Sequence, residues 1–150
     1  MVEHGENADN LGMLLRSADA AGASSVVLAA GTTDPFSRRA VRGSRGAVFS
    51  LPICIAGFAR RAIEEASGRG LRIVATSANA DTEYTAFDYT GPVMIVVGNE
   101  HTGLSAETRA LADAVVRIPM LGRIHSLNIA VAASLVLYEA ARQRRIKSEG

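Results

Sequence analysis

The sequence is poor in several features that mark particular classes of protein. Its 150 residues hold one cysteine, no tryptophan and only 5% aromatic residues. A single cysteine excludes a disulfide framework and a cysteine-based zinc site. Cys54 itself lies in an apolar run and is predicted to be a small buried core residue. No apolar run reaches the roughly 18 residues of a membrane span, and no signal-peptide pattern opens the chain, so we expect a cytoplasmic protein.

Net charge is also nearly absent. Sixteen basic residues face 15 acidic ones, for a net charge of +1, so general basicity gives no argument for nucleic-acid binding. Lysine is almost missing, because Lys147 is the only one and every other basic residue is arginine. A GC-rich genome produces the same bias. Arginine suits phosphate because its planar fork of donors matches phosphate oxygens, and four arginines fall within eight residues at 38–45.

Apolar runs alternate with helical patterns along the chain. Strands are predicted at 1–4, 25–30, 47–55 (interrupted by Pro52), 71–78, 92–98 and 114–119. Helices are predicted from a cap at Asp9 or Asn10 to Ala21, and over 59–67, 104–112 (capped by Ser105) and 126–144. A short helix or loop is expected at 37–42 and a polar loop at 79–91. This alternation predicts one α/β domain over residues 1–150, with a mostly parallel sheet flanked by helices on both faces.

The last predicted helix has an unusual pattern. Residues 127–141 are apolar nearly all round, until Glu139. A surface helix shows a single apolar stripe. We therefore expect this helix to be buried on several sides, either inside the fold or in a subunit interface.

Three glycine-bearing segments lie at predicted connections from a strand to the following helix. They are NLGMLLRSADAAG (10–22), VVGNEHTGLS (96–105) and RIPMLGRIHSLNIAVAAS (117–134). In open α/β sheets, ligands bind at such loops beyond the carboxyl ends of the strands. The segments therefore predict one composite site.

In this order, the three segments resemble the motifs of the SpoU/TrmH-type RNA methyltransferases of the SPOUT superfamily. VRGSRGA (41–47) is similar to a further segment of that family. The resemblance implies a sheet with a deep trefoil knot at its C-terminal end, and a homodimer formed through the last helix. It also implies methyl transfer from S-adenosylmethionine to a ribose 2′-hydroxyl of tRNA or rRNA.

The resemblance also assigns catalytic residues. Asn10 and Arg16 resemble the family's catalytic pair, and Glu100 resembles the glutamate that orients the arginine and the substrate. Ser126 and Asn128 resemble the pair that supports the arginine and the ribose. Ser126 is also a candidate for the cap of the last helix. Because a guanidinium keeps its proton in proteins, we expect Arg16 to clamp a phosphate and stabilise the developing alkoxide.

The sequence does not identify the general base. His101 and His125 lie inside or beside the motifs, and histidine titrates near neutral pH, so both are candidates. The implied contacts to S-adenosylmethionine are Thr76, Gly98, Asn99, Gly103, Ile118, Met120 and Leu127. No metal is expected, because displacement at a sulfonium mainly requires positioning of the reactants.

The implied partner is RNA, whose phosphates Arg38, Arg39, Arg42 and Arg45 are expected to contact. Many members of the family carry an RNA-binding domain before the first strand. Here that domain is either absent or lies outside this chain. The sequence does not indicate which RNA or which nucleotide is methylated.

Three alternatives remain. The first is a non-catalytic RNA-binding or dimerisation domain on the same fold. The second is a methyltransferase that acts on an RNA base. The third is a generic nucleotide-binding α/β domain. The sequence argues against it, because it has neither a GxGxxG turn after a strand nor a P-loop.

Overall fold

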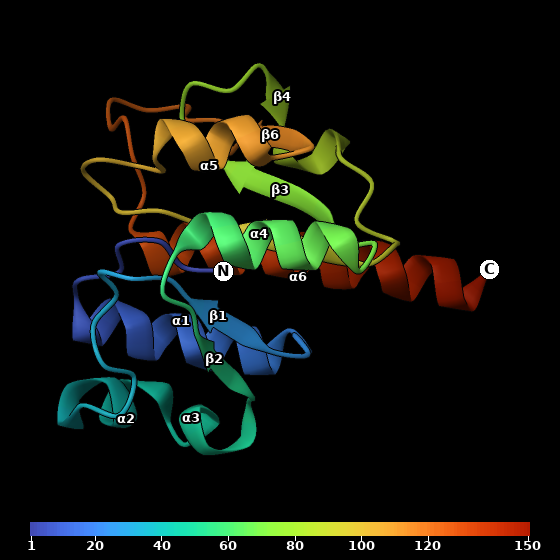
Figure 1. The fold of residues 1–150 in the computed structure, drawn as a ribbon. Coiled ribbons are helices and arrows are strands. Elements are labelled where there is room, and N and C mark those ends of the chain that lie inside the picture. The colour runs from blue at the N-terminus through green and yellow to red at the C-terminus, as the bar shows by residue number, and fades with distance from the viewer.

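A sheet of short strands runs through the middle of the molecule, with helices on both sides (Figure 1). The computed structural model describes residues 1–150. Its strands are β1 (Val26–Leu28), β2 (Ile53–Ile55), β3 (Arg72–Thr76), β4 (Thr82–Glu83), β5 (Val93–Val96) and β6 (Ala114–Arg117). Its helices are α1 (Ala8–Ala20), α2 (Arg38–Ser44), α3 (Ala47–Ser50), α4 (Ala59–Gly68), α5 (Ala106–Leu111) and α6 (Ile129–Glu149), with a 3-10 turn at Tyr84–Ala86.

The paired strands are parallel. β1 pairs with β2, and the other four strands lie in the order β4-β6-β3-β5. Residues 1–3 join the two groups, because Val2 pairs in parallel with both Leu28 of β1 and Val97 next to β5. The chain thus builds outward through β1 and β2 and then crosses back to add β3 on the other side. The predicted parallel α/β sheet is confirmed, and its winding direction reverses between residues 1–3 and β5.

The side chains of β3 alternate between two cores, as those of a strand covered on both faces must. Ile73 and Ala75 are fully buried in a cluster with Ile63 of α4. Val74, between them, is buried in a different cluster with Val136 of α6. α4 and α5 therefore cover one face of this part of the sheet and α6 covers the other.

The stretch predicted as one strand over 47–55 is instead a helical turn followed by a strand. α3 ends at Ser50, and β2 begins only after Pro52, which has no N–H for a ladder. β2 forms the outer edge of the sheet. Cys54 is exposed there, so the prediction that it lies in the core is wrong.

The two helices that carry motif residues begin elsewhere than predicted. α1 begins behind Asn7, whose side chain accepts from the backbone N–H of Asn10, so neither Asp9 nor Asn10 is its cap. α6 begins behind Asn128, so the prediction that Ser126 caps it is wrong, and the helix continues to Glu149. In both places an asparagine oxygen lies within reach of free N–H groups of the first turn.

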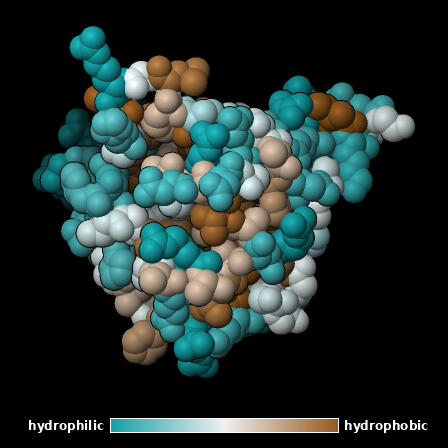
Figure 2. Space-filling view, turned by 90° about the horizontal axis from the view of Figure 1, so that it is seen from above, coloured by the Kyte–Doolittle hydropathy of each residue, from teal (hydrophilic) through white to brown (hydrophobic).

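α6 is buried along one side only. Ala133, Val136 and Ala140 are buried, whereas Val131, Leu135 and Tyr138 on its other side are exposed. Beyond the sheet its C-terminal end projects from the body, and Figure 2 shows this projection from above as mostly hydrophilic. The predicted burial on several sides is therefore incomplete within one chain. None of the helices combines the length and apolar character needed to cross a membrane.

α1 and α2 cross in close contact at two glycines. A Cβ on Gly12 would lie 2.6 Å from the carbonyl oxygen of Ala40 and 2.9 Å from the Cα of Gly43. Both neighbours are backbone atoms, which cannot turn aside. The crossing fixes α2, and with it Arg39, which pairs with Asp9 of α1.

We expect Gly12→Ala to lower the free energy of unfolding by about 1–3 kcal/mol, because the added methyl forces the helices apart. Gly57→Ala is the matched control, since its Cβ would meet nothing within 4 Å. Urea denaturation of both variants measures the difference. Equal stability of the two would contradict the close crossing.

Candidate active site

Four loops meet at the carboxyl-terminal edge of the parallel strands. They follow residues 1–3, β3, β5 and β6, and their side chains line two adjoining cavities. The start of α1 and the start of α6 close the same region. The parallel strands thus bring together motif residues as far apart in the sequence as Asn10 and Asn128, which are separated by 118 positions.

A chain of hydrogen bonds ties the three motifs to one another. The side-chain amide of Asn10 donates to Oε1 of Glu100 at 2.7 Å, and that of Asn128 donates to Oδ1 of Asn10 at 2.9 Å. The same Glu100 oxygen accepts from the backbone N–H of Ile129 at 3.0 Å. Three of the five residues assigned to catalysis from the sequence therefore form one network.

The start of α6 sets the direction of this network. Oδ1 of Asn128 accepts from the backbone N–H groups of Ala130 and Val131, so its amide nitrogen must face Asn10. Asn10 then presents its oxygen to Asn128 and its nitrogen to Glu100. Oε2 of Glu100 takes no hydrogen bond from within the chain. This carboxylate oxygen is left free to bind a donor from outside.

The first cavity, of about 140 Å³, matches the cofactor contacts assigned from the sequence. All seven predicted residues line it: Thr76, Gly98, Asn99, Gly103, Ile118, Met120 and Leu127. Glu100 and Ser126 lie in the same lining. The wall combines apolar side chains with the polar backbone groups of glycine-bearing loops, which is the composition of a small-molecule site.

One of these loops closes so tightly that it needs glycine. A Cβ on Gly98 would lie 2.6 Å from the carbonyl carbon of Gly103 and 2.7 Å from the backbone nitrogen of Leu104. Gly103 has a φ of +66°, a conformation that side chains disfavour. The loop therefore brings bare backbone up to the cavity.

The second cavity, of about 310 Å³, is more polar. It lies between the loop that follows residues 1–3 and the loop that follows β5, where the winding of the sheet reverses. Open α/β sheets bind ligands in this crevice. His4, Asn7, Asn10 and His101 line it. Asn99, Glu100 and Ile129 line both cavities, so Glu100 stands at their boundary.

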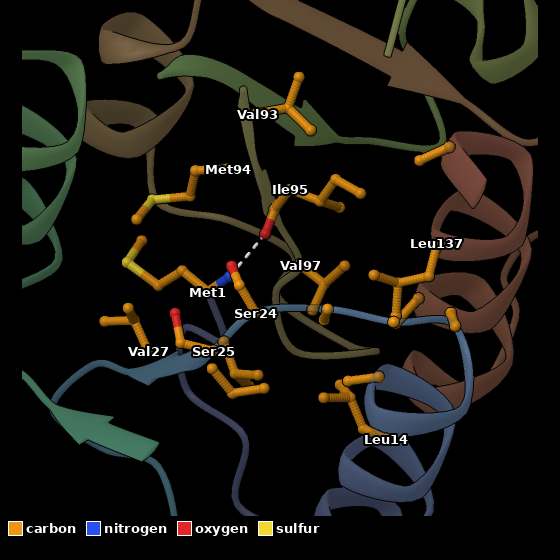
Figure 3. A pocket seen from close by; sticks show the side chains of 18 of the residues that line it. Met1, Leu14, Ser24, Ser25, Val27, Val93, Met94, Ile95, Val97 and Leu137 are labelled. Carbon is orange, nitrogen blue, oxygen red and sulfur yellow. Dashed lines mark hydrogen bonds between the residues drawn. The ribbon is translucent and has the colours of Figure 1, made fainter. Parts of the chain in front are cut away.

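A third cavity is mostly apolar, and its wall includes Leu14 of α1, Val97 and Leu137 of α6 (Figure 3). It holds about 150 Å³ between the start of β1, β5 and α6. The backbone nitrogen of Met1 donates to the carbonyl of Ile95 at its wall. No residue assigned to the site lines this cavity.

The remaining assigned residues lie outside the network. Arg16 is exposed, makes no hydrogen bond or ion pair and lines neither cavity. It follows Asn10 by six residues, which turns it about 120° away around α1. Ser126 lines the first cavity without a hydrogen bond. His101 lines the second cavity, and His125 lines neither.

The four assigned arginines gather on α2 and the residue after it. Arg38, Arg39, Arg42 and Arg45 are all exposed, and only Arg39 has an ion-pair partner. The Asp9 partner lies in the first turn of α1, next to Asn10. The cluster therefore stands beside the polar cavity. No group of three or more His, Cys, Asp or Glu side chains is placed to hold a metal ion.

Comparison with known proteins gives the same assignment as the motifs. Residues 1–138 match the SpoU rRNA Methylase family. The chain belongs to this family. The 23S rRNA (uridine(2479)-2′-O)-methyltransferase of Streptomyces viridochromogenes is 41% identical over 140 residues, which cover 90% of this chain and 49% of that protein. The 23S rRNA (guanosine-2′-O-)-methyltransferase RlmB of Pseudomonas putida is 38% identical over 141 residues, covering 92% and 56%.

The likeness to solved SpoU structures extends over nearly the whole chain. The SpoU methyltransferase AviRb from Streptomyces viridochromogenes, in complex with the cofactor AdoMet, superposes with a TM-score of 0.91 at 36% identity. The superposition covers 97% of this chain and 59% of that one. This chain thus spans about half the length of the curated SpoU relatives that it matches.

Sequence reasoning missed two residues of this SpoU site. Asn7 lines the polar cavity and caps α1. The available signal was an asparagine just before a helix-forming stretch, but the cap was predicted two or three residues later, at Asp9 or Asn10. Glu3 lies buried behind the loop that carries Glu100, and its charge inside the apolar first strand was the available signal.

We expect Asn128→Asp to destabilise this SpoU site at neutral pH. The introduced carboxylate still caps α6, but it cannot donate to Asn10, and it adds a negative charge near Glu100. An unsatisfied half-buried group costs about 1–3 kcal/mol. Protonation of either carboxyl restores a donor, so the penalty should be larger at pH 7 than at pH 4.

Asn7→Asp is the control, because Asn7 caps α1 through its oxygen without donating to Asn10. Urea unfolding of both variants at the two pH values measures the penalties. A penalty that is the same at pH 4 and pH 7 for Asn128→Asp would contradict the proposed direction of the network.

Proposed function

We propose that this SpoU domain transfers a methyl group from S-adenosylmethionine to a ribose 2′-hydroxyl of tRNA or rRNA. The observation that carries the proposal is the Asn10–Glu100–Asn128 network at the boundary of two cavities. One cavity has the lining assigned to the methyl donor, and the other is polar and lies beside the arginines of α2. The names of the relatives, 23S rRNA 2′-O-methyltransferases, support the same chemistry.

The methyl donor would be held by the first cavity. Ile118, Met120 and Leu127 would contact its apolar parts, and the backbone around Gly98 and Gly103 would bind its polar groups. When bound, S-adenosylmethionine supplies an electrophilic methyl group on a good leaving group. We further propose that the loops lining this cavity form the trefoil knot implied by the motifs.

The chain's own residues would bind and orient the ribose. Glu100, fixed by Asn10 and the N–H of Ile129, has its Oε2 free to accept a hydrogen bond from the 2′-hydroxyl or from a guanidinium. A carboxylate held in this way loses little freedom on binding, which favours a reactive geometry. Arg38, Arg42 and Arg45 would bind neighbouring phosphates, which supplies affinity without sequence choice.

A direct test incubates the chain with S-adenosylmethionine and with total rRNA and tRNA, and digests the product for mass spectrometry. We expect a nucleoside methylated on its ribose, and no transfer to an RNA with 2′-deoxyribose at the target. Methyl groups on a base would favour the alternative base methyltransferase. Cofactor binding without transfer to any RNA would favour a non-catalytic domain.

We also propose a homodimer formed by α1 and α6. Met13, Val131, Leu135 and Tyr138 form an apolar face, with 44, 47, 39 and 54% of their surfaces exposed. These residues line a shallow hollow of about 390 Å³ between the two helices. Leu137, by contrast, packs against the core of its own chain. A second copy seated on the apolar face would complete the burial that the α6 pattern predicts.

Arg16 lies on the same helix as Met13 and has no partner within its own chain. We propose that it serves the site of the other copy, where it would clamp the substrate phosphate beside Glu100. In a symmetric pair each arginine would then complete the opposite site.

Mixing two inactive variants tests this arrangement. Arg16→Ala and Glu100→Gln should each abolish transfer alone. After exchange of subunits, half of the pairs are mixed and each has one intact site, so we expect about a quarter of wild-type activity to return. No recovery would place Arg16 in its own chain's site. Adding Leu135→Glu to both variants should prevent the recovery by breaking the apolar face.

A further inference from the structure

We propose that Glu3 is a positioning residue for the methyl-donor cavity, through its hold on the 98–104 loop. The inference rests on the proposed function, since it concerns the binding of the same donor. Glu3 lines neither cavity. It can therefore affect the donor cavity only through the residues that it binds.

Glu3 is a buried carboxylate with no cation beside it. Only 4% of the residue is exposed. Oε1 accepts from the hydroxyls of Ser105 at 2.9 Å and Thr108 at 2.8 Å, and Oε2 accepts from the backbone N–H of Ser105 at 2.9 Å. Burial of a charge is costly unless hydrogen bonds compensate it. All three bonds go to the start of α5, which directly follows the 98–104 loop.

Residues 1–3 therefore hold both ends of the 98–104 loop. At the incoming end, the N–H of Val97 donates to the carbonyl of Met1, and the N–H of Glu3 donates to the carbonyl of Val97. At the outgoing end, the Glu3 carboxylate holds Ser105. A third tether runs from the side-chain amide of Asn99 to the carbonyl of His4 at 3.3 Å.

Between these anchors the loop is closed by its own backbone. The N–H of Gly103 donates to the carbonyl of Asn99 at 2.8 Å, and Gly98 lies directly against Gly103. The loop supplies Gly98, Asn99 and Gly103 to the donor cavity. Releasing Ser105 would let the Gly103 side move, while Glu100 stays tied to Asn10 and Ile129. The donor site should therefore suffer more than the ribose site.

Glu3→Gln tests the proposal, because it keeps the shape and removes the charge and one acceptor. Calorimetric titration should show the dissociation constant for S-adenosylmethionine rising roughly tenfold, equivalent to about 1.4 kcal/mol. Activity at saturating donor should change less. Thr108→Val removes one donor to the same carboxylate without changing side-chain size much, and it should shift the constant in the same direction by a smaller factor.

Glu139→Gln is the matched control. Glu139 is also a buried carboxylate, 8% exposed, but it accepts from Arg142 and Gln143 on the outer part of α6. We expect its substitution to lower the melting temperature and to leave the donor constant unchanged. If Glu3→Gln also lowers only the melting temperature, Glu3 is merely structural and the proposal is wrong.

Hydrogen exchange separates this outcome from a failure of the proposed function. Without any ligand, Glu3→Gln should speed exchange at the amides of Gly103 and Ser105, and Glu139→Gln should not. If the wild-type chain binds no S-adenosylmethionine, the proposed function fails, and the exchange rates still decide whether Glu3 holds the loop. Unchanged exchange at both amides would overturn the positioning role.

Discussion

The site depends on the orientation of one amide, that of Asn128. Its oxygen is required by the free N–H groups at the start of α6, so its nitrogen must point at Asn10. Asn10 is then forced to donate to Glu100. A helix cap, which usually has only local consequences, here sets the direction of a network that joins three segments distant in sequence.

The parallel sheet determines where this network lies. Because neighbouring strands run in the same direction, the loops that follow them gather at one edge. Reversal of the winding between residues 1–3 and β5 leaves a crevice at that edge. The Glu100 loop follows β5 and borders this crevice on one side and the first cavity on the other. The boundary between the two cavities is therefore a result of topology, and the network occupies it.

The sequence predicted much of this arrangement and missed particular parts for physical reasons. The apolar runs gave the inner strands correctly, because β3 and β5 are covered by helices. The prediction was wrong at the edge of the sheet, where residues 47–55 form α3 and β2 instead of one strand, since an outer strand need not be long or buried. The ordered motifs picked out seven residues, predicted as donor contacts, that the fold places around one cavity. Glu3 was not found, because its importance lies in contacts with Ser105 and Thr108, about 100 residues away.

Within a single chain, the carboxylate of Glu100 is held in the proposed site, whereas the guanidinium of Arg16 lies outside it. Glu100 is held by two hydrogen-bond partners, Asn10 and the N–H of Ile129, whereas Arg16 is exposed on α1. An ion pair formed in advance between the two would occupy the Glu100 oxygen that the substrate needs, and it would bury charge at a cost in desolvation. Under the proposed function, a guanidinium that arrives with a second subunit and a substrate phosphate meets both negative groups together. Charge neutralisation is then coupled to assembly and RNA binding, so the isolated chain keeps an open site.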